Sequence, residues 1–140
     1  MTENRFLQSD REVIGDNHRF VSGFAALCGI KAELVEADHA VFSLEYRPEL
    51  ANRYGVFHGG VLVTLADQAT GVATHTDGRK YVTLSSDFHF LDNADGGTVT
   101  AEAVVLRRGQ TTCVTEVKLR AENGQLLASG AFTFYCIPQA

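Results

Sequence analysis

The chain has few cysteines, and they form no recognisable pattern. Cys28, Cys113 and Cys136 lie far apart, and none belongs to a C-x-x-C pair. An odd number of widely spaced cysteines predicts neither a disulfide framework nor a cysteine-ligated zinc site. We therefore expect reduced, buried thiols in a cytoplasmic protein.

The chain also lacks a surplus of basic residues and any long apolar run. Its formal net charge is −5, so no excess of cations is available to neutralise the phosphates of a nucleic acid. Residues 1–12 are charged and contain no apolar segment of a signal peptide. No apolar run approaches the ~20 residues that cross a bilayer. The sequence therefore argues against nucleic acid and a membrane as partners.

What remains is the composition of an ordinary globular protein. The 140 residues are 45% hydrophobic and 21% charged, which fits one domain with a real core. Residues 1–16 are polar and predict a loosely docked arm, and residues 17–140 predict a single domain.

A short helix is predicted near the start of this domain. Asn17 is expected to cap a helix over residues 18–28, which Gly29 ends. One apolar stripe is expected along this helix, formed by Phe20, Phe24 and Leu27.

Strand-like alternation surrounds a second, longer helix. Two runs, residues 30–37 and 40–47, precede that helix and flank an Asp38-His39 turn. Four runs follow it, over residues 81–91, 98–106, 111–121 and 126–137. The short links between them predict antiparallel neighbours. We expect an α+β fold in which the long helix covers one face of a sheet of about six strands.

The candidate chemistry is concentrated in residues 52–76. His58-Gly59-Gly60 precedes a helix expected over residues 61–76. The glycines let the backbone approach a ligand, and the free N–H groups of a helix start carry partial positive charge. Such donors suit a carbonyl oxygen that gains negative charge during acyl transfer.

One face of the long helix is apolar and the other carries a single charge. Asp67 shares its face only with small or uncharged residues, namely Val63, Thr70, Gly71 and Thr74. A solvated helix face is normally charged, so we expect a ligand or a second subunit to pack there. The alternative is a fully buried helix with Asp67 hydrogen-bonded to backbone. Seven residues are expected to lie on the sheet: Val61, Leu62, Leu65, Ala66, Ala69, Val72 and Ala73.

Two helical turns separate Gly59 from Asp67, about 10–12 Å along the axis. Either the substrate is long, or Gly59 of one subunit meets Asp67 of another. His58 could bind a substrate or orient the loop, and Asn52 could donate to a carbonyl or position water. Each of these two side chains has a purely structural alternative.

The spacing N-x-x-G-x-x-H-G-G-x-x-x-x-x-x-D resembles the hotdog-fold acyl-CoA thioesterases of the phenylacetate-degradation type. It is met by Asn52, Gly55, His58, Gly59, Gly60 and Asp67, and the resemblance covers nearly the whole chain. The resemblance implies a six-stranded antiparallel sheet wrapped around one long helix. It also implies a homodimer with sites at the subunit interface, often doubled to a homotetramer, and no metal or redox cofactor.

The resemblance assigns roles to individual residues. It implies that Asp67 is the general base or the nucleophile and that the Gly59 N–H polarises the thioester carbonyl. Asn52 and His58 would assist, and the Ser85 hydroxyl would position the water. The residues implied to bind substrate or coenzyme A are Gly60, Arg107, Arg108 and Gly109. Two arginines at a hairpin tip are equally typical of a solvated turn, so the phosphate contact stays open.

One departure from the family lies after the third strand. Many members carry an Arg-Pro pair where this chain has Asp92-Asn93, which puts the loop shape there in doubt.

The predicted function is hydrolysis of an acyl-CoA thioester to free CoA and a carboxylic acid. The alternative is a non-catalytic acyl-CoA binding or regulatory protein on the same fold, although a binder has no need of Asp67. A hotdog dehydratase is a third possibility, but those enzymes pair a histidine with an acidic residue on a differently spaced helix. The sequence leaves open whether the acyl group is aryl or fatty.

Overall fold

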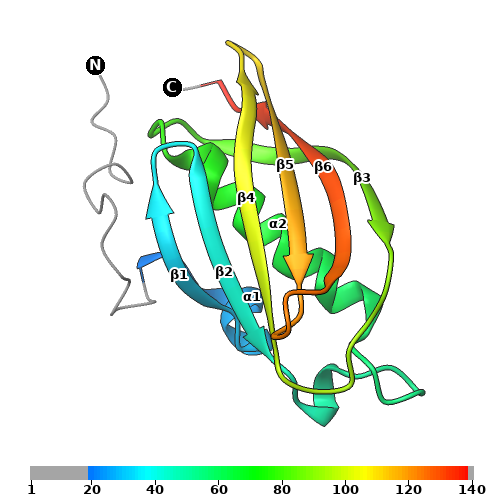
Figure 1. The fold of residues 1–140 in the computed structure, drawn as a ribbon. Coiled ribbons are helices and arrows are strands. Elements are labelled where there is room, and N and C mark those ends of the chain that lie inside the picture. Colours follow the sequence, from blue (N-terminus) through cyan, green and yellow to red (C-terminus); the bar gives the residue numbers. More distant parts are fainter. Residues whose placement is uncertain (1–18, 139–140) are drawn as a thin grey trace.

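The computed structural model describes residues 19–138 (Figure 1). The predicted arm, residues 1–16, and the predicted cap Asn17 lie outside the described residues. The elements are α1 (Gly23–Cys28), β1 (Lys31–Glu36), β2 (His39–Glu45), the 3-10 helix η3 (Pro48–Leu50), α2 (Gly59–His75), β3 (Tyr81–Phe90), β4 (Thr98–Arg108), β5 (Thr112–Arg120) and β6 (Leu126–Cys136).

The six strands form one antiparallel sheet in the order β1-β2-β4-β5-β6-β3. The sheet curves around α2, which lies along its concave face (Figure 1). Strands β1 and β3 form the two edges. The predicted α+β fold is confirmed: residues 19–138 contain six strands and two α-helices in the predicted order.

The core lies between α2 and the sheet. All seven helix residues predicted to face the sheet are buried, from Val61 to Ala73. They pack with fully buried side chains of the strands, such as Phe42, Leu44 and Leu119. Each fully buried leucine contributes about 1.5–3 kcal/mol, so packing, more than helix propensity, holds α2 in place.

Part of the small-residue face of α2 is also covered by the chain itself. Thr70 and Thr74 are fully buried, and their hydroxyls donate to the carbonyls of Ala66 and Thr70 at 2.8 Å. No hydrogen-bonding group is left unsatisfied by burying them. The expectation that a ligand or a second subunit covers this face therefore does not hold for these two threonines.

Helix α1 is shorter than predicted, although it ends where predicted. It begins at Gly23 rather than residue 18, and Ser22 occupies the N-cap position. Gly29 ends the helix with φ 85°, the left-handed conformation that glycine adopts without strain. The predicted C-terminal glycine is thus confirmed.

The predicted apolar stripe of α1 is wrong. Phe20 is buried but precedes the helix, whereas Phe24 is 64% exposed and Leu27 is 76% exposed. Ala25 and Cys28 face the core instead. Because the helix has six residues, a stripe that needs eight cannot form on it.

All three cysteines are free thiols. Cys28 and Cys113 are buried as predicted, whereas Cys136 is only partly buried. None of the helices in residues 19–138 combines the length and the hydrophobicity that a bilayer crossing requires. In the same part of the chain, no group of three or more His, Cys, Asp or Glu side chains is placed to hold a metal ion.

Candidate active site

The loop before α2 is folded onto itself by Asn52. The side-chain Oδ1 of Asn52 accepts a hydrogen bond from the Tyr54 N–H at 2.8 Å. Its backbone N–H donates to the Val56 carbonyl at 2.8 Å, and Ala51 and Phe57 form a β-bridge across the loop base. Asn52 therefore has the structural role of a turn residue. Its Nδ2 forms no hydrogen bond within residues 19–138.

His58 caps the start of α2. Its Nδ1 accepts the Gly60 N–H at 2.9 Å, so this ring nitrogen carries no proton. The His58 carbonyl accepts the N–H groups of Val61 and Leu62 at 3.0 and 3.3 Å. In the first turn of the helix, every backbone N–H except one therefore has a hydrogen-bond acceptor.

That remaining donor is the Gly59 N–H, which has no acceptor among the described residues. Gly59 is partly exposed at the start of α2. A Cβ built on Gly59 would lie 3.5 Å from the ring of Phe90, at the end of β3. The structure thus presents one free backbone donor with the partial positive charge of the helix start, beside an aromatic ring.

Asp67 lies in the middle of α2 and is half-buried. Its Oδ1 accepts a hydrogen bond from the Thr83 hydroxyl at 2.7 Å, and Thr83 lies near the start of β3. No cationic side chain of residues 19–138 forms an ion pair with Asp67. The carboxylate is therefore held by a neutral hydroxyl and is not neutralised by a neighbouring charge.

The structure does not bring Ser85 to Asp67. Thr83 pairs with Phe134 across the strands, but after a bulge at Leu84 the next pair is Ser85 with Thr133. Phe134 points into the core, so Thr83 faces α2 and Ser85 lies on the opposite face of the sheet. Thr83 is the residue that sequence reasoning missed, because a bulge cannot be read from alternation.

A groove opens beside Asp67, between α2 and the start of β3. Its volume is about 490 Å³, and its apolar lining comes mainly from Phe20, Val72, Val82 and Phe134. Gly71 lies in the wall of the groove, and because glycine has no side chain it leaves the groove wide at this point.

The segment of residues 19–22 closes one side of this groove. The Gln68 amide nitrogen donates to the Phe20 carbonyl at 2.7 Å and ties the segment to α2. The groove is therefore bounded by three separate parts of the chain, and Asp67 lies at its rim.

The candidate site has two halves, the free Gly59 N–H and the Asp67 carboxylate, and these two half-sites lie far from each other within one chain. Gly59 and Asp67 lie on the same helix, eight residues and about 12 Å apart along its axis. One carbonyl carbon cannot contact both groups in the same subunit.

Of the two arginines predicted to bind coenzyme A, Arg108 is already engaged. It forms ion pairs with Asp38 at 2.7 Å and Asp77 at 3.0 Å, and it donates to the Thr74 carbonyl at 2.8 Å near the end of α2. Arg108 therefore stabilises the helix end and the β1–β2 turn.

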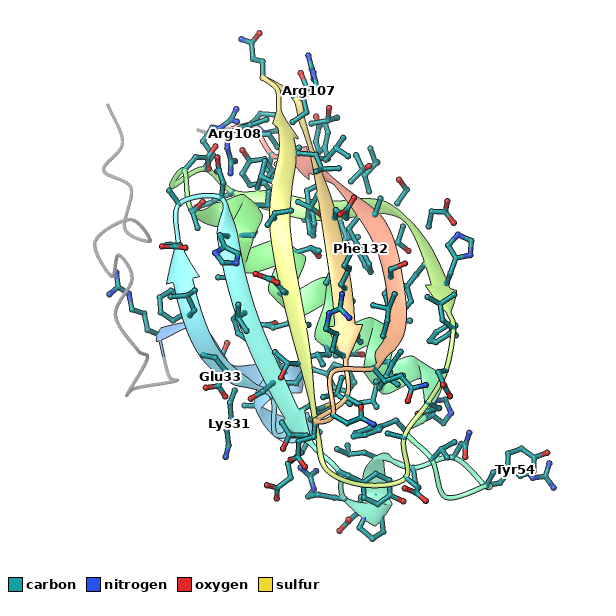
Figure 2. All side chains as sticks on the ribbon, in the orientation of Figure 1. Lys31, Glu33, Tyr54, Arg107, Arg108 and Phe132 are labelled. Carbon is teal, nitrogen blue, oxygen red and sulfur yellow. The ribbon has the colours of Figure 1, made fainter. Side chains whose placement is uncertain are left out.

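Arg107, by contrast, is exposed and forms no ion pair within residues 19–138. Gly109 closes the turn beside it by donating to the Thr112 carbonyl at 2.8 Å. Figure 2 shows both arginines at the same end of the molecule, remote from the start of α2 in this view.

The segment Asp92-Asn93, where many family members carry an Arg-Pro pair, also has a structural role. The side chain of Asn93 donates to the Phe57 carbonyl at 2.9 Å, and the Phe57 N–H donates to the Ala94 carbonyl at 3.1 Å. This loop therefore fixes the segment that leads into Gly59.

Comparisons with known proteins agree with this architecture. A family model described as the thioesterase superfamily matches residues 54–128, which include Gly59, Asp67 and Thr83. A protein of Saccharolobus solfataricus named as an esterase is 32% identical over 110 residues, which cover 77% of this chain and 79% of that protein. A 1,4-dihydroxy-2-naphthoyl-CoA hydrolase of Listeria monocytogenes is 33% identical over 108 residues, which cover 75% of this chain and 88% of that protein.

Solved structures share the same fold. The PaaI protein of the E. coli phenylacetic acid degradation operon superposes with a TM-score of 0.80 at 26% identity, over 83% of this chain and 85% of that chain. A thioesterase protein of Streptococcus pneumoniae, solved with coenzyme A, superposes with a TM-score of 0.75 at 29% identity, over 79% of this chain and 87% of that chain.

Proposed function

The chain belongs to the thioesterase superfamily and is a thioester hydrolase, and we propose that it hydrolyses acyl-CoA at a site shared by two subunits. The observation that carries the shared site is the placement of the two half-sites along β3. Thr83, which holds Asp67, lies near the start of the strand, and Phe90, which lies against Gly59, ends it.

Strand β3 is a sheet edge suited to pairing with its own copy. Among the described residues it pairs only with β6, and its exposed apolar side chains include Val82 at 49% and Leu84 at 58%. An unpaired edge of this length is a template for a further strand. Antiparallel pairing of two copies about a two-fold axis sets the start of one β3 against the end of the other.

That pairing joins the half-sites. Thr83 and Phe90 pair with the core residues Phe134 and Ala128, so both lie on the helix-covered face. Asp67 of one subunit then lies beside Gly59 of the partner subunit. The distance that separates the two groups within one chain is bridged by the second chain.

In the proposed reaction the thioester carbonyl oxygen accepts the Gly59 N–H. Asp67 takes a proton from a water molecule, whose oxygen forms a bond to the carbonyl carbon while negative charge develops on the carbonyl oxygen. The C–S bond then breaks, the thiolate of CoA leaves and takes up a proton, and a carboxylic acid remains. Direct attack by Asp67 on the carbonyl carbon is the alternative; in that case water hydrolyses the resulting anhydride.

The remaining residues support these two groups. Because the Gly60 N–H already donates to His58, the Gly59 N–H is the donor left to bind the substrate carbonyl. Asn52 shapes the loop before it. Thr83 takes the place that the resemblance gave to Ser85, because its hydroxyl contacts Asp67.

The groove beside Asp67 is the proposed acyl pocket. Its volume of about 490 Å³ is large enough for an aryl or medium-length acyl group, and its lining combines apolar side chains such as Phe20 and Val72 with polar ones such as Arg19 and Gln68. The named substrate of the Listeria monocytogenes relative is an aryl-CoA, and the Streptococcus pneumoniae structure contains coenzyme A, which support this class. We propose a cytoplasmic enzyme whose dimers pair again, with the exposed Phe24 and Leu27 of α1 as candidate contacts between dimers.

The test is an assay of free thiol release from a panel of aryl- and fatty acyl-CoAs, with wild type beside Asp67→Ala. Turnover of at least one ester by wild type and loss of that turnover in Asp67→Ala are expected. A panel without turnover, or an Asp67→Ala variant as fast as wild type, refutes the proposed mechanism. A monomeric mass by light scattering at assay concentration refutes the shared site.

A further inference from the structure

The loop between η3 and α2 reaches past the exposed edge of the sheet. Tyr54 lies at the tip of this loop and is 79% exposed. Figure 2, in the orientation of Figure 1, shows Tyr54 on the same side of the molecule as β3 and farther out than that strand. Because β3 is the edge that pairs with its copy in the proposed dimer, the loop extends toward the partner subunit.

The backbone and the ring at the loop tip are held in place. The Asn52 side chain accepts the Tyr54 N–H at 2.8 Å, and the Tyr46 hydroxyl donates to the Gly55 carbonyl at 2.9 Å. Gly55 has φ 79°, a conformation that favours glycine. The guanidinium carbon of Arg53 lies 5.7 Å from the centre of the Tyr54 ring, within range of a cation–π contact. A preorganised ring loses little conformational entropy when it binds a ligand.

The direction of α2 decides where this loop lies in the proposed dimer. Helix α2 runs antiparallel to β3, because the Phe90 ring lies beside Gly59 at the end of the strand and His75 accepts the Tyr81 N–H at 3.2 Å at its start. Antiparallel pairing of two β3 strands reverses this order in the partner. The residues that precede Gly59 in one subunit therefore lie beside the segment from Asp67 to His75 of the partner subunit.

That segment forms one side of the proposed acyl groove. The groove follows α2 from Asp67 past Gly71 to His75, about 12 Å along the helix axis. Val82 and Thr83 line it at the sheet edge, and both residues are exposed in the single chain. A side chain of the partner subunit can therefore close the groove at this edge.

This is also the direction in which the acyl group extends. In the proposed function the carbonyl is bound where Gly59 of one subunit meets Asp67 of the other, so the acyl group runs from Asp67 along the groove toward His75. The loop of the partner subunit lies over this part of the groove. Tyr54 offers a large, stiff ring that can cover an apolar acyl group while its hydroxyl stays in contact with water.

We propose that Tyr54 of each subunit covers the acyl groove of the partner subunit and thereby selects among acyl groups. The expected preference is for an aryl or bulky acyl group that reaches the ring, over a short one such as acetyl. This inference rests on the proposed function and adds a specificity-determining residue to the site. The residue belongs to the chain that supplies Gly59, whereas the groove belongs to the chain that supplies Asp67.

The first test compares acyl-CoAs of increasing size. Tyr54→Ala should lower kcat/KM about ten-fold for an aryl ester such as phenylacetyl-CoA, the effect of losing one aromatic contact, and should affect acetyl-CoA least. Tyr54→Phe keeps the ring and should retain the wild-type preference. An equal loss for every ester, or a change of mass in solution, shows that Tyr54 only holds the dimer together and overturns the proposal. Unchanged kinetics across the series also overturn it.

The second test asks which chain supplies the ring. An Asp67→Ala chain and a Gly59→Pro chain, which lacks the Gly59 N–H, are refolded together, so that each mixed dimer has one site with both groups intact. The intact Gly59 of that site belongs to the Asp67→Ala chain. Tyr54→Ala is added to this chain in one mixture and to the Gly59→Pro chain in the other. The two mixtures contain the same substitutions, and each is the matched control of the other.

The acyl preference of the recovered activity gives the answer. Tyr54→Ala on the Asp67→Ala chain should produce the altered preference, and Tyr54→Ala on the Gly59→Pro chain should leave the wild-type preference. The reverse pattern places the ring over the groove of its own subunit; that pattern, or one preference in both mixtures, overturns the inference and leaves the proposed function intact. If mass spectrometry shows mixed dimers but neither mixture recovers activity, the shared site is refuted, and the inference with it.

Discussion

The Thr83 hydroxyl donates to Oδ1 of Asp67 across 2.7 Å and links the edge strand β3 to the middle of α2. This hydrogen bond orients the carboxylate and leaves Oδ2 without a partner among the described residues. It is the structural reason to assign the supporting hydroxyl of the site to Thr83.

Thr83→Val should therefore lower kcat about 10–100-fold, because a hydrogen bond to a charged group is lost at similar side-chain volume. Thr83→Ser keeps the hydroxyl and should stay within a few-fold of wild type. Steady-state kinetics with one acyl-CoA measures both. Ser85→Ala is the matched control, and a larger effect there than in Thr83→Val contradicts the assignment.

Gly59→Pro isolates the backbone donor. Proline removes the N–H but fits the first position of a helix, and His58 already has the extended conformation, φ −63° and ψ 134°, that a residue before proline requires. The variant should fold with unchanged circular dichroism and lose about 10²–10³ in kcat. Gly59→Ala keeps the N–H, and its Cβ would meet Phe90 at an ordinary 3.5 Å. Equal losses in both variants would point to a steric effect.

Mixing two inactive variants tests the shared site. In a dimer of one Asp67→Ala chain and one Gly59→Pro chain, one site has both intact groups and the other has neither. Random exchange of equal amounts should restore about a quarter of wild-type activity, since half the dimers are mixed and each has one working site. The measurement is thiol release after co-refolding. No recovery in mixtures shown by mass spectrometry to contain mixed dimers contradicts the shared site.

Asp77 should stabilise the fold in a pH-dependent way. Burial alone would raise the pKa of Asp77, but hydrogen bonds from Tyr81 and Arg79 and the charge of Arg108 hold that pKa below its ordinary value of 3.8. A lowered pKa in the folded state means that the stabilisation is present above pH 3.8 and is lost as the pH falls through the folded-state pKa.

Asp77→Asn should accordingly be less stable than wild type near neutral pH, and the difference should shrink in acid. Urea unfolding at one fixed protein concentration measures this, since assembly also affects apparent stability. The exposed Asp95 provides the control, and Asp95→Asn should leave the free energy of unfolding near neutral pH close to that of wild type. A difference that grows as the pH falls contradicts the sign of this prediction.

Gly71 should set the size of the acyl group. A Cβ at this position would lie 3.7 Å from the Phe134 ring, so alanine fits without displacing a neighbour. Gly71→Ala should raise the melting temperature slightly, because glycine within a helix is less favourable by about 0.5–1 kcal/mol. Gly71→Leu should lower kcat/KM for bulky acyl-CoAs much more than for acetyl-CoA. Equal losses across the acyl series would remove the groove from the site.

The fold was readable from sequence because its elements are long and periodic. The seven buried residues of α2 follow a helical period, and strands such as β4 and β5 alternate between buried and more exposed residues. Prediction failed for α1, where Phe24 and Leu27 matched a helical stripe that a six-residue helix cannot present. Periodicity is informative only over a segment long enough to display it.

The sequence predicted the helix start and the carboxylate of the candidate site, but not the other side chains that contact them. Gly59 and Asp67 follow from the helix start and from a lone carboxylate. Thr83 does not, because the bulge at Leu84 changes which hydroxyl faces α2. For Arg108 the sequence predicts either a contact to coenzyme A or a solvated turn. Its partners Asp38 and Asp77 are distant in sequence, and only the folded chain brings the three residues together.

The exposed edge of β3 also bears on how the protein is made. A newly synthesised chain carries this unpaired strand until it meets a second copy, and in that interval the edge is open to any other extended chain. In the proposed dimer, the pairing that completes the site also covers the edge. Quality control and activation would then be a single event, so that a chain becomes active only when it is no longer prone to aggregate.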